Sequence, residues 1–166
     1  MSRLDSMIRR LQAQRDGIEW AGRRISDLGG DVLEVGLGNG RTYDHLREKL
    51  PEREIWVIER EPAAHPKSTP PSDRLLVGEA DAGLAELARR GVRVALIHYD
   101  LGVGIADVDH PLAAGLSPAM AALLVPGGIV LANNPLVGLP EIKGPDTVPL
   151  ERYFFYRKPD AERESA

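Results

Sequence analysis

Apolar residues recur at spacings of three, four and seven over residues 1–30, a pattern typical of one amphipathic helix or of two consecutive helices. These apolar positions are Leu4, Met7, Ile8, Leu11, Ile18, Ala21, Ile25 and Leu28. Asp16-Gly17 is the expected weak point, because glycine costs about 1 kcal/mol relative to alanine inside a helix. The pair Gly29-Gly30 predicts where the helical segment ends.

Some of these apolar residues also follow the seven-residue repeat of a helix–helix seam between subunits. They are Leu4, Leu11, Ile18 and Ile25. Gln14 interrupts the second row of this seam. We therefore expect the segment over residues 1–30 to pack on its own domain, and we keep a homo-oligomer formed through this helix as the alternative.

Short apolar runs alternate with helical patterns along the middle of the chain. The expected buried strands are 31–35, 55–58, 75–77, 92–97 and 129–132, and the expected helices are 41–50, 84–91 and 118–124. Four prolines between residues 60 and 73 exclude a long helix there, so this connection is expected to be mostly loop. Strands that alternate with helices in this way predict an α/β fold around a Rossmann-like, mostly parallel sheet.

The C-terminal part of the chain predicts a shortened end to this sheet. Residues 150–157 are rich in aromatic side chains and are expected to form a final, antiparallel strand. Too few residues lie between Asn134 and Val148 for a complete helix plus strand, so the terminal hairpin should be reduced. We expect the α/β domain to span residues 31–158 and the polar residues 159–166 to form a flexible tail.

Composition narrows the classes of function. The chain has 166 residues, 43% of them hydrophobic, and a net charge of −4, which argues against a broad nucleic-acid-binding surface. It contains no cysteine, which excludes disulfides, thiolate catalysis and Cys-ligated zinc. No apolar run approaches the roughly 20 residues that span a bilayer. Residues 1–15 lack the apolar core of a signal peptide, so we expect a cytoplasmic protein with no nucleic-acid or membrane partner.

Polar or glycine residues stand at the carboxyl end of every strand in the central series. They are Gly36 to Gly40, Glu59, Glu79, Asp100 and Asn133-Asn134. Ligands of open α/β sheets bind beyond these strand ends, where the strand order reverses. The glycine-rich turn from strand to helix would also direct free backbone N–H groups at a ligand.

A dinucleotide is the first alternative for that ligand. The G-x-G-x-x-G pattern that binds dinucleotides needs a small third residue, and counting from Gly36 and Gly38 that residue is Arg41. A long cationic side chain there disfavours a pyrophosphate site. The chain also lacks the G-x-x-x-x-G-K-[ST] motif of nucleoside triphosphatases.

The pattern acid-x-Gly-x-Gly-x-Gly, which begins at Glu34, resembles the first motif of class I S-adenosylmethionine-dependent methyltransferases. The resemblance extends over residues 31 to about 136 and includes the turn at 125–128. In that family an acid at the position of Glu59 accepts hydrogen bonds from both ribose hydroxyls. Gly78-Glu79-Ala80 is similar to the family's Gly-Asp-Ala, whose acid binds the adenine amino group, and Asp81 is the alternative for this role.

The resemblance implies a cofactor, S-adenosyl-L-methionine, and a set of residues that bind it. The set is Glu34, Gly36, Leu37, Gly38, Gly40, Glu59, Arg60, Glu79, Ala80 and Asp100. Within it, Glu34 is expected to reach the amino group of the methionine moiety. The methyl acceptor is expected to be a small molecule.

Methyl transfer is an in-line displacement at a sulfonium, so the protein must align the acceptor and, where needed, remove a proton. The candidate catalytic residues are Asp100 and His98, which share a face if the strand continues that far. Asp100 with Asn133-Asn134 also resembles the metal site of catechol-type O-methyltransferases, whose oxygen ligands suit magnesium or calcium, although an amide replaces one carboxylate here. We expect no metal and keep this site as the alternative.

Two other functions are consistent with the same motifs. A cofactor-binding or regulatory module without catalysis would explain the lack of a clear base. An aminopropyltransferase-like enzyme of the same fold would use acids to bind a cationic acceptor, and Asp100, Asp107 and Asp109 lie in the relevant region.

Overall fold

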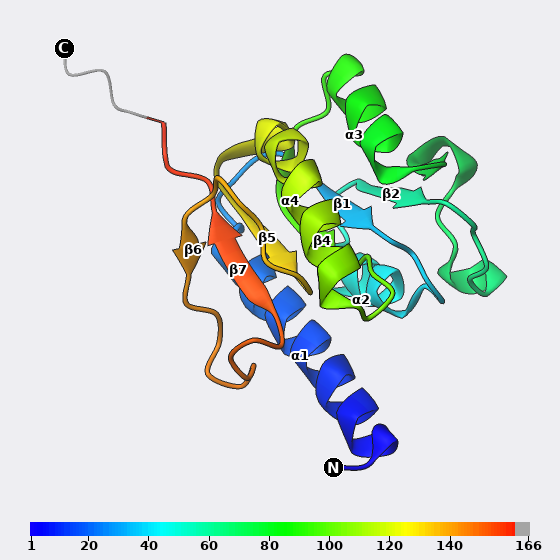
Figure 1. Cartoon of the computed structure of the whole chain (residues 1–166). Coiled ribbons are helices and arrows are strands. Elements are labelled where there is room, and N and C mark those ends of the chain that lie inside the picture. Colours follow the sequence, from blue (N-terminus) through cyan, green and yellow to red (C-terminus); the bar gives the residue numbers. More distant parts are fainter. Residues whose placement is uncertain (162–166) are drawn as a thin grey trace.

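The computed structural model describes residues 1–161, in which a seven-stranded sheet lies between two layers of helices (Figure 1). The strands are β1 (Asp31–Val35), β2 (Ile55–Glu59), β3 (Leu75–Val77), β4 (Val94–Tyr99), β5 (Leu124–Ala132), β6 (Glu141–Ile142) and β7 (Phe154–Arg157). Their order in the sheet is β3-β2-β1-β4-β5-β7-β6. The first five strands pair in parallel, and β7 is antiparallel to both β5 and β6. The predicted Rossmann-like fold is confirmed.

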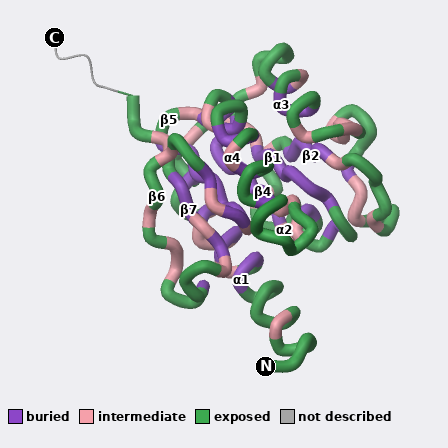
Figure 2. Tube along the Cα trace, in the orientation of Figure 1, coloured by how far each residue is buried: buried purple, intermediate pink, exposed green. Residues whose placement is uncertain are grey.

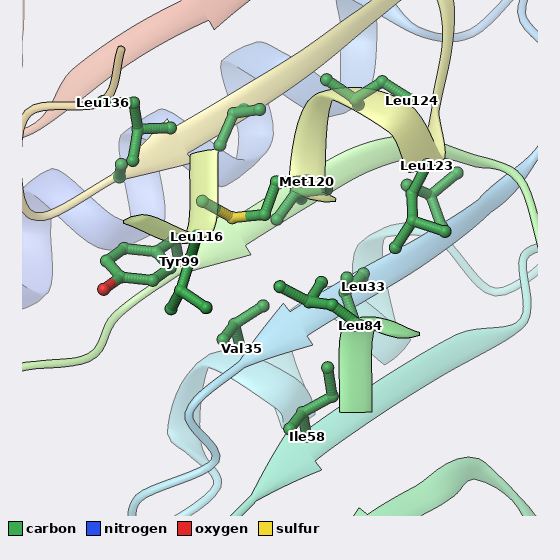
Figure 3. Close-up of a cluster of buried hydrophobic side chains, with 14 of the residues drawn as sticks. Leu33, Val35, Ile58, Leu84, Tyr99, Leu116, Met120, Leu123, Leu124 and Leu136 are labelled. Carbon is green, nitrogen blue, oxygen red and sulfur yellow. The ribbon is translucent and has the colours of Figure 1, made fainter. Parts of the chain in front are cut away.

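Two hydrophobic clusters, one on each face of the sheet, form the core. The helices are α1 (Arg3–Arg24), α2 (Arg41–Lys49), α3 (Ala80–Arg89) and α4 (Ala106–Leu123). Side chains of α1 and α2 pack on one face. Side chains of α3 and α4, among them Leu84, Leu116 and Met120, pack on the other face against Leu33 and Ile58 (Figure 3). The strands between these layers are buried along most of their length (Figure 2).

The N-terminal segment is one continuous helix that ends earlier than predicted. Ser2 caps it in a reciprocal box with Asp5, and it passes through Gly17 without a break. A Cβ on Gly17 would lie 3.1 Å from the side chain of Leu131, so the glycine lets α1 approach β5 closely. The helix ends at Arg24 rather than at residues 29–30, because Ile25 leaves the helical conformation.

The C-terminal half of α1 packs on the sheet. Ile18 and Ile25 are buried in the core, whereas Leu4 is 69% exposed and Leu11 is 37% exposed. This exposed N-terminal half extends from the body of the molecule (Figure 2). A homo-oligomer formed through these exposed residues remains a prediction.

The connection between β4 and β5 departs most from the sequence analysis. Helix α4 begins at Ala106 and not near Pro118, and β5 begins directly after it at Leu124. The prediction was wrong because Pro111 and Pro118 both lie inside the helix, where proline normally interrupts the hydrogen bonding. Packing of the apolar face of α4 on the sheet outweighs that loss.

The shortened C-terminal hairpin is confirmed, with one strand that the sequence did not predict. No helix separates β5 from β6 within the described residues, and β6 is only two residues long. β7 starts at Phe154 instead of residue 150, since the chain turns at Glu151, which has a positive φ of 66°. The connection between β2 and β3 is loop with two short 3₁₀ turns, Pro66–Ser68 and Ser72–Arg74, as predicted.

No helix among residues 1–161 is both long and apolar enough to cross a bilayer. The predicted flexible tail falls mainly on residues 162–166, which lie outside the described residues.

Candidate functional site

The glycine loop after β1 lies where the strand order reverses. β1 pairs with β2 on one side and with β4 on the other, so the connections that follow these strands diverge. Gly36 has a φ of 97°, and a Cβ there would lie 2.8 Å from the carbonyl oxygen of Asp100. Gly38 has a φ of 52°, and a Cβ there would meet no atom within 4 Å. The loop is thus packed against β4 at Gly36 and open at Gly38.

Glu59, at the end of β2, holds this loop in place. Its Oε2 accepts hydrogen bonds from the backbone N–H groups of Leu37, at 2.8 Å, and Gly38, at 3.1 Å. Its Oε1 accepts one from the N–H of Glu61 at 3.0 Å. An ionised carboxylate offers about four acceptor positions. Since three are used here, Glu59 keeps capacity for a ligand hydroxyl.

A pocket of about 690 Å³ opens beside Glu59. Its polar wall consists of Glu59, Arg60, Gly78, Glu79, Ala80, Asp81 and Asp109, and its apolar wall includes Leu101, Val103, Val108 and Leu112. The volume falls within the range of about 300–1,000 Å³ for pockets that bind small ligands. Four predicted cofactor-binding residues, at 59, 60, 79 and 80, line this pocket, together with Asp81, the alternative to Glu79. Both Glu79 and Asp81 face it, so the two alternatives for the adenine amino group stay open.

Asp109 organises the apolar wall, and the sequence analysis did not identify this role. Its carboxylate is buried and accepts backbone N–H bonds from Val103, Gly104 and Ile105 at 2.8–3.1 Å. These hydrogen bonds lower the pKa of Asp109, against the opposing effect of burial. Because the acid lies at the start of α4, it also fixes the loop that follows β4.

We expect Asp109→Asn to lower the melting temperature at pH 7, because a neutral amide accepts hydrogen bonds less strongly than a carboxylate. A folded-state pKa below the unfolded value, about 3.9, stabilises the protein above that pH and ceases to do so as the pH falls through the folded pKa. The difference in melting temperature between wild type and variant should therefore decrease below about pH 4. Thermal melts from pH 3 to 7 would measure it, with the exposed Asp107→Asn as control. A gap that does not change with pH would contradict this role.

A second, smaller pocket of about 200 Å³ lies against the glycine loop. It is lined by Met7, Arg10, Leu11 and Gln14 of α1, by Gly36 to Asn39, by Arg41 and Thr42, and by Asp100. Arg10 Nη2 donates to both carboxylate oxygens of Asp100 at 3.0 Å, and Gln14 Nε2 donates to Oδ2 at 2.8 Å. Burial lowers the pKa of Arg10, but the adjacent Asp100 outweighs it and the net shift is upward.

Glu34 is wholly buried beside this pocket and forms part of a polar cluster. Its Oε1 accepts a hydrogen bond from the Thr42 hydroxyl and lies 3.3 Å from Nδ1 of His98. His98 is the residue of β4 that pairs with Glu34 of β1 in the sheet. Its Oε2 has no hydrogen-bond partner among the described residues. Glu34 lines neither pocket, so its contact with the amino group of a ligand stays a prediction.

His98, predicted as a catalytic candidate, is wholly buried and lines neither pocket. Its ring stacks on Tyr153, with centroids 5.9 Å apart. Burial lowers the pKa of His98, but the hydrogen bond and charge of Glu34 outweigh it and the net shift is upward. This position supports a structural role more than proton transfer to a ligand.

Asn133 and Asn134, the alternative metal ligands, have other contacts. Both side-chain amides donate to the carbonyl oxygen of Leu101 at 3.0 Å. Asp100 is hydrogen-bonded to a guanidinium, whose positive charge disfavours a cation beside it. Within residues 1–161, no cluster of three or more acidic or histidine side chains has the arrangement of a metal site.

Comparisons with known proteins agree with this geometry. A family model described as S-adenosyl-L-methionine methyltransferase matches residues 1–158. The chain is similar to the crystal structure of an S-adenosyl-L-methionine methyl transferase from Silicibacter pomeroyi DSS-3, with 40% identity and a TM-score of 0.89. That match covers 95% of this chain and 99% of the other.

More distant structures share the fold alone. Human methyltransferase-like protein 13 in complex with SAH has 15% identity and a TM-score of 0.54, over 96% of this chain and 82% of that one. The protein-(glutamine-N5) methyltransferase from Alicyclobacillus acidocaldarius has 14% identity and a TM-score of 0.51, and the match covers 89% of this chain and 93% of the other. No curated protein sequence matches the chain.

Proposed function

Because the chain belongs to the S-adenosyl-L-methionine methyltransferase family, we propose that it transfers the cofactor's methyl group to a small-molecule acceptor. The observation that carries the acceptor class is the position of α1. Arg10 and Gln14 hold this helix over the carboxyl end of β4, and the pocket beneath it measures about 200 Å³. A pocket of this small volume favours a small acceptor over a macromolecule.

The residues around the two pockets suit this cofactor. When bound, S-adenosyl-L-methionine supplies a methyl group activated by a sulfonium charge. Glu59 has one acceptor position left for a ribose hydroxyl, and Leu101 and Val103 would pack against an adenine ring. Gly38 leaves space for a ligand next to the main chain. Glu34 has an unpartnered Oε2 behind the glycine loop, and we assign it the amino group of the methionine moiety, directly or through water.

Catalysis then depends mainly on alignment. An acceptor held between α1 and the ends of β4 and β5 would be brought close to the methyl group in one orientation. Of the two catalytic candidates, Asp100 lines the smaller pocket and His98 is buried beneath it. Asp100 is therefore the better placed of the two to contact a bound ligand.

Calorimetry with S-adenosyl-L-homocysteine tests the cofactor, and we expect a dissociation constant in the micromolar range. A second experiment tests the acceptor by measuring S-adenosyl-L-homocysteine release with either the small-molecule or the macromolecular fraction of a cell extract. Release should require the small-molecule fraction. Absence of any binding to the wild-type protein would overturn the proposed function, and release with only the macromolecular fraction would overturn the acceptor class.

A further inference from the structure

Most of the large apolar side chains that face solvent in the described chain lie in two segments. The first is the N-terminal half of α1, which includes Leu4 and Ile8. The second is the segment 103–112, which leads into α4, and there Val103 is 70% exposed and Ile105 is 55% exposed. Soluble monomers rarely expose extensive contiguous apolar surface, and such surface marks an interaction site. These two segments are therefore the best candidates for one.

The two segments adjoin each other at the carboxyl edge of the parallel strands (Figure 1). Arg10 of α1 donates to the carboxylate of Asp100 at 3.0 Å, and Asp100 stands three residues before Val103. Together the segments form what we call the α1–α4 surface. Its exposed apolar residues are Leu4, Met7, Ile8, Leu11, Val103, Ile105, Val108 and Leu112.

The α1 half of this surface is basic. Leu4 and Leu11 begin the same seven-residue row as Ile18, which is buried against the sheet, so this row continues beyond the sheet edge. Exposed arginines flank the row on both sides, one position before or four positions after its leucines. They are Arg3, Arg10 and Arg15.

The other half of the α1–α4 surface is acidic. Asp107 is exposed within the segment 103–112. Val103 and Val108 also line the 690 Å³ pocket, and the charged residues described around this pocket are four acids and one cation, Arg60. The acids are Glu59, Glu79, Asp81 and Asp109. The two halves of the surface therefore carry opposite charge.

A surface with a basic half and an acidic half is complementary to itself. A two-fold rotation places the basic half of one copy on the acidic half of the other, at two equivalent contacts, and it buries both apolar rows. An anionic membrane would attract the α1 half but repel the acidic half beside it. A seam between two α1 helices would bring the flanking arginines together. The charges thus favour a second copy of this chain, paired helix to loop.

We propose that two copies of the chain form a reciprocal dimer, in which the N-terminal half of each α1 packs on residues 103–112 of the other copy. This inference goes beyond the proposed function, because the argument for the dimer uses no property of the cofactor. It also gives the partner a part in the site. Val103, Val108 and Leu112 belong to both the dimer surface and the larger pocket, so the partner's helix would cover the open side of that pocket.

Sedimentation velocity tests the dimer without any ligand, and we expect the wild type to have twice the monomer mass at about 10 μM. Leu4→Glu adds an acid to the basic half, and Ile105→Lys adds a cation to the acidic half. Each should weaken the dimer by at least about tenfold, because like charges would meet. Both residues are exposed and line neither pocket at the glycine loop, so circular dichroism should show the wild-type fold.

Glu52→Lys is the control, because it changes an exposed charge before β2, at the opposite edge of the sheet. It should dimerise as the wild type does. A wild-type protein that stays monomeric at about 100 μM would overturn the proposal. If this monomer sedimented with vesicles of phosphatidylcholine and phosphatidylserine, the surface would instead be assigned to a membrane.

An equimolar mixture of Leu4→Glu and Ile105→Lys tests the reciprocal pairing. In a mixed dimer, one of the two contacts combines both new charges, which have opposite sign, and the other contact is that of the wild type. The mixture should therefore dimerise more strongly than either variant alone. Absence of this recovery would contradict the pairing of helix with loop. An Ile105→Lys variant that dimerises like the wild type would indicate a seam between α1 helices and would also overturn the proposal.

Calorimetry with S-adenosyl-L-homocysteine tests whether the partner contributes to the larger pocket. Leu4 lines neither pocket of its own chain, so Leu4→Glu should act on binding only through the dimer. We expect its affinity to fall by about 3- to 10-fold at a concentration at which the wild type is dimeric. An unchanged affinity would overturn the partner's part in the site. A wild-type dimer that binds no S-adenosyl-L-homocysteine would support the dimer and overturn the proposed function.

Discussion

Glu59→Ala is expected to reduce affinity for S-adenosyl-L-homocysteine by at least about 100-fold, since it removes charge-assisted hydrogen bonds on two sides of the carboxylate. On one side, Glu59 holds the N–H groups of Leu37 and Gly38. On the other, it is the proposed acceptor for a ribose hydroxyl. Loss of the side chain would free the loop and leave the ribose without its partner. Calorimetric titration of wild type and variant measures the change.

Two further variants make this result specific. Glu61→Ala is the control, because only the backbone N–H of Glu61 contacts Glu59 and its side chain is exposed. It should bind like the wild type. Glu59→Gln keeps the length of the side chain but offers one acceptor oxygen instead of two, so its affinity should be intermediate. A Glu59→Ala variant that binds within threefold of the wild type would show that the carboxylate does not bind the cofactor.

Gly36→Ala is expected to destabilise the fold by about 2–5 kcal/mol, because strain and overpacking act together. The φ of 97° is unfavourable for any residue with a Cβ, and that atom would lie 2.8 Å from the backbone oxygen of Asp100 and 2.9 Å from the Leu101 side chain. The backbone of Asp100 directly follows β4 and is held by the hydrogen bond from its N–H to the carbonyl oxygen of Val35, so it cannot move aside cheaply. The melting temperature should fall by roughly 5–20 °C in a chain of this size.

Gly38→Ala provides the comparison within the same loop. Its φ of 52° lies in the left-handed helical region, and its Cβ would enter open space. The free energy of unfolding should fall by about 1–2 kcal/mol, because only the backbone conformation is unfavourable. Thermal melts of the two variants should therefore differ clearly, with Gly36→Ala much the less stable. Equal melting temperatures would mean that the close approach of the loop to β4 does not limit the residue at 36.

The sequence predicted the features that depend on local pattern. The strands and the glycine turn come from runs of apolar residues and from residues with special backbone freedom, so neighbours in the chain suffice to identify them. Glu59 and Glu79 could be placed near the turn because parallel strands bring their carboxyl ends to one edge of the sheet. The structure places both on one pocket beside the loop.

The parts that sequence reasoning missed depend on contacts between distant segments. Nothing in the helical pattern of α1 connects Arg10 with Asp100, and Gln14 appeared only as a polar interruption of an apolar row. The predicted helix 118–124 is only the end of α4, which begins at Ala106 and includes Pro111, so tertiary packing outweighs the local disruption by proline. Asp109 was considered as an acid for a cationic acceptor, yet its carboxylate is occupied by three backbone N–H groups of its own chain.

Because α1 is one continuous helix, its two ends move together as a rigid body. Its C-terminal half packs on the sheet, where Gly17 contacts Leu131. Arg10 lies seven residues earlier in the same helix, roughly 10 Å from Gly17 along the helix axis. A change in the tilt of the helix at Gly17 would therefore also move Arg10. The position of the Arg10 guanidinium beside Asp100 therefore depends on the close packing of α1 at Gly17, where a side chain would not fit.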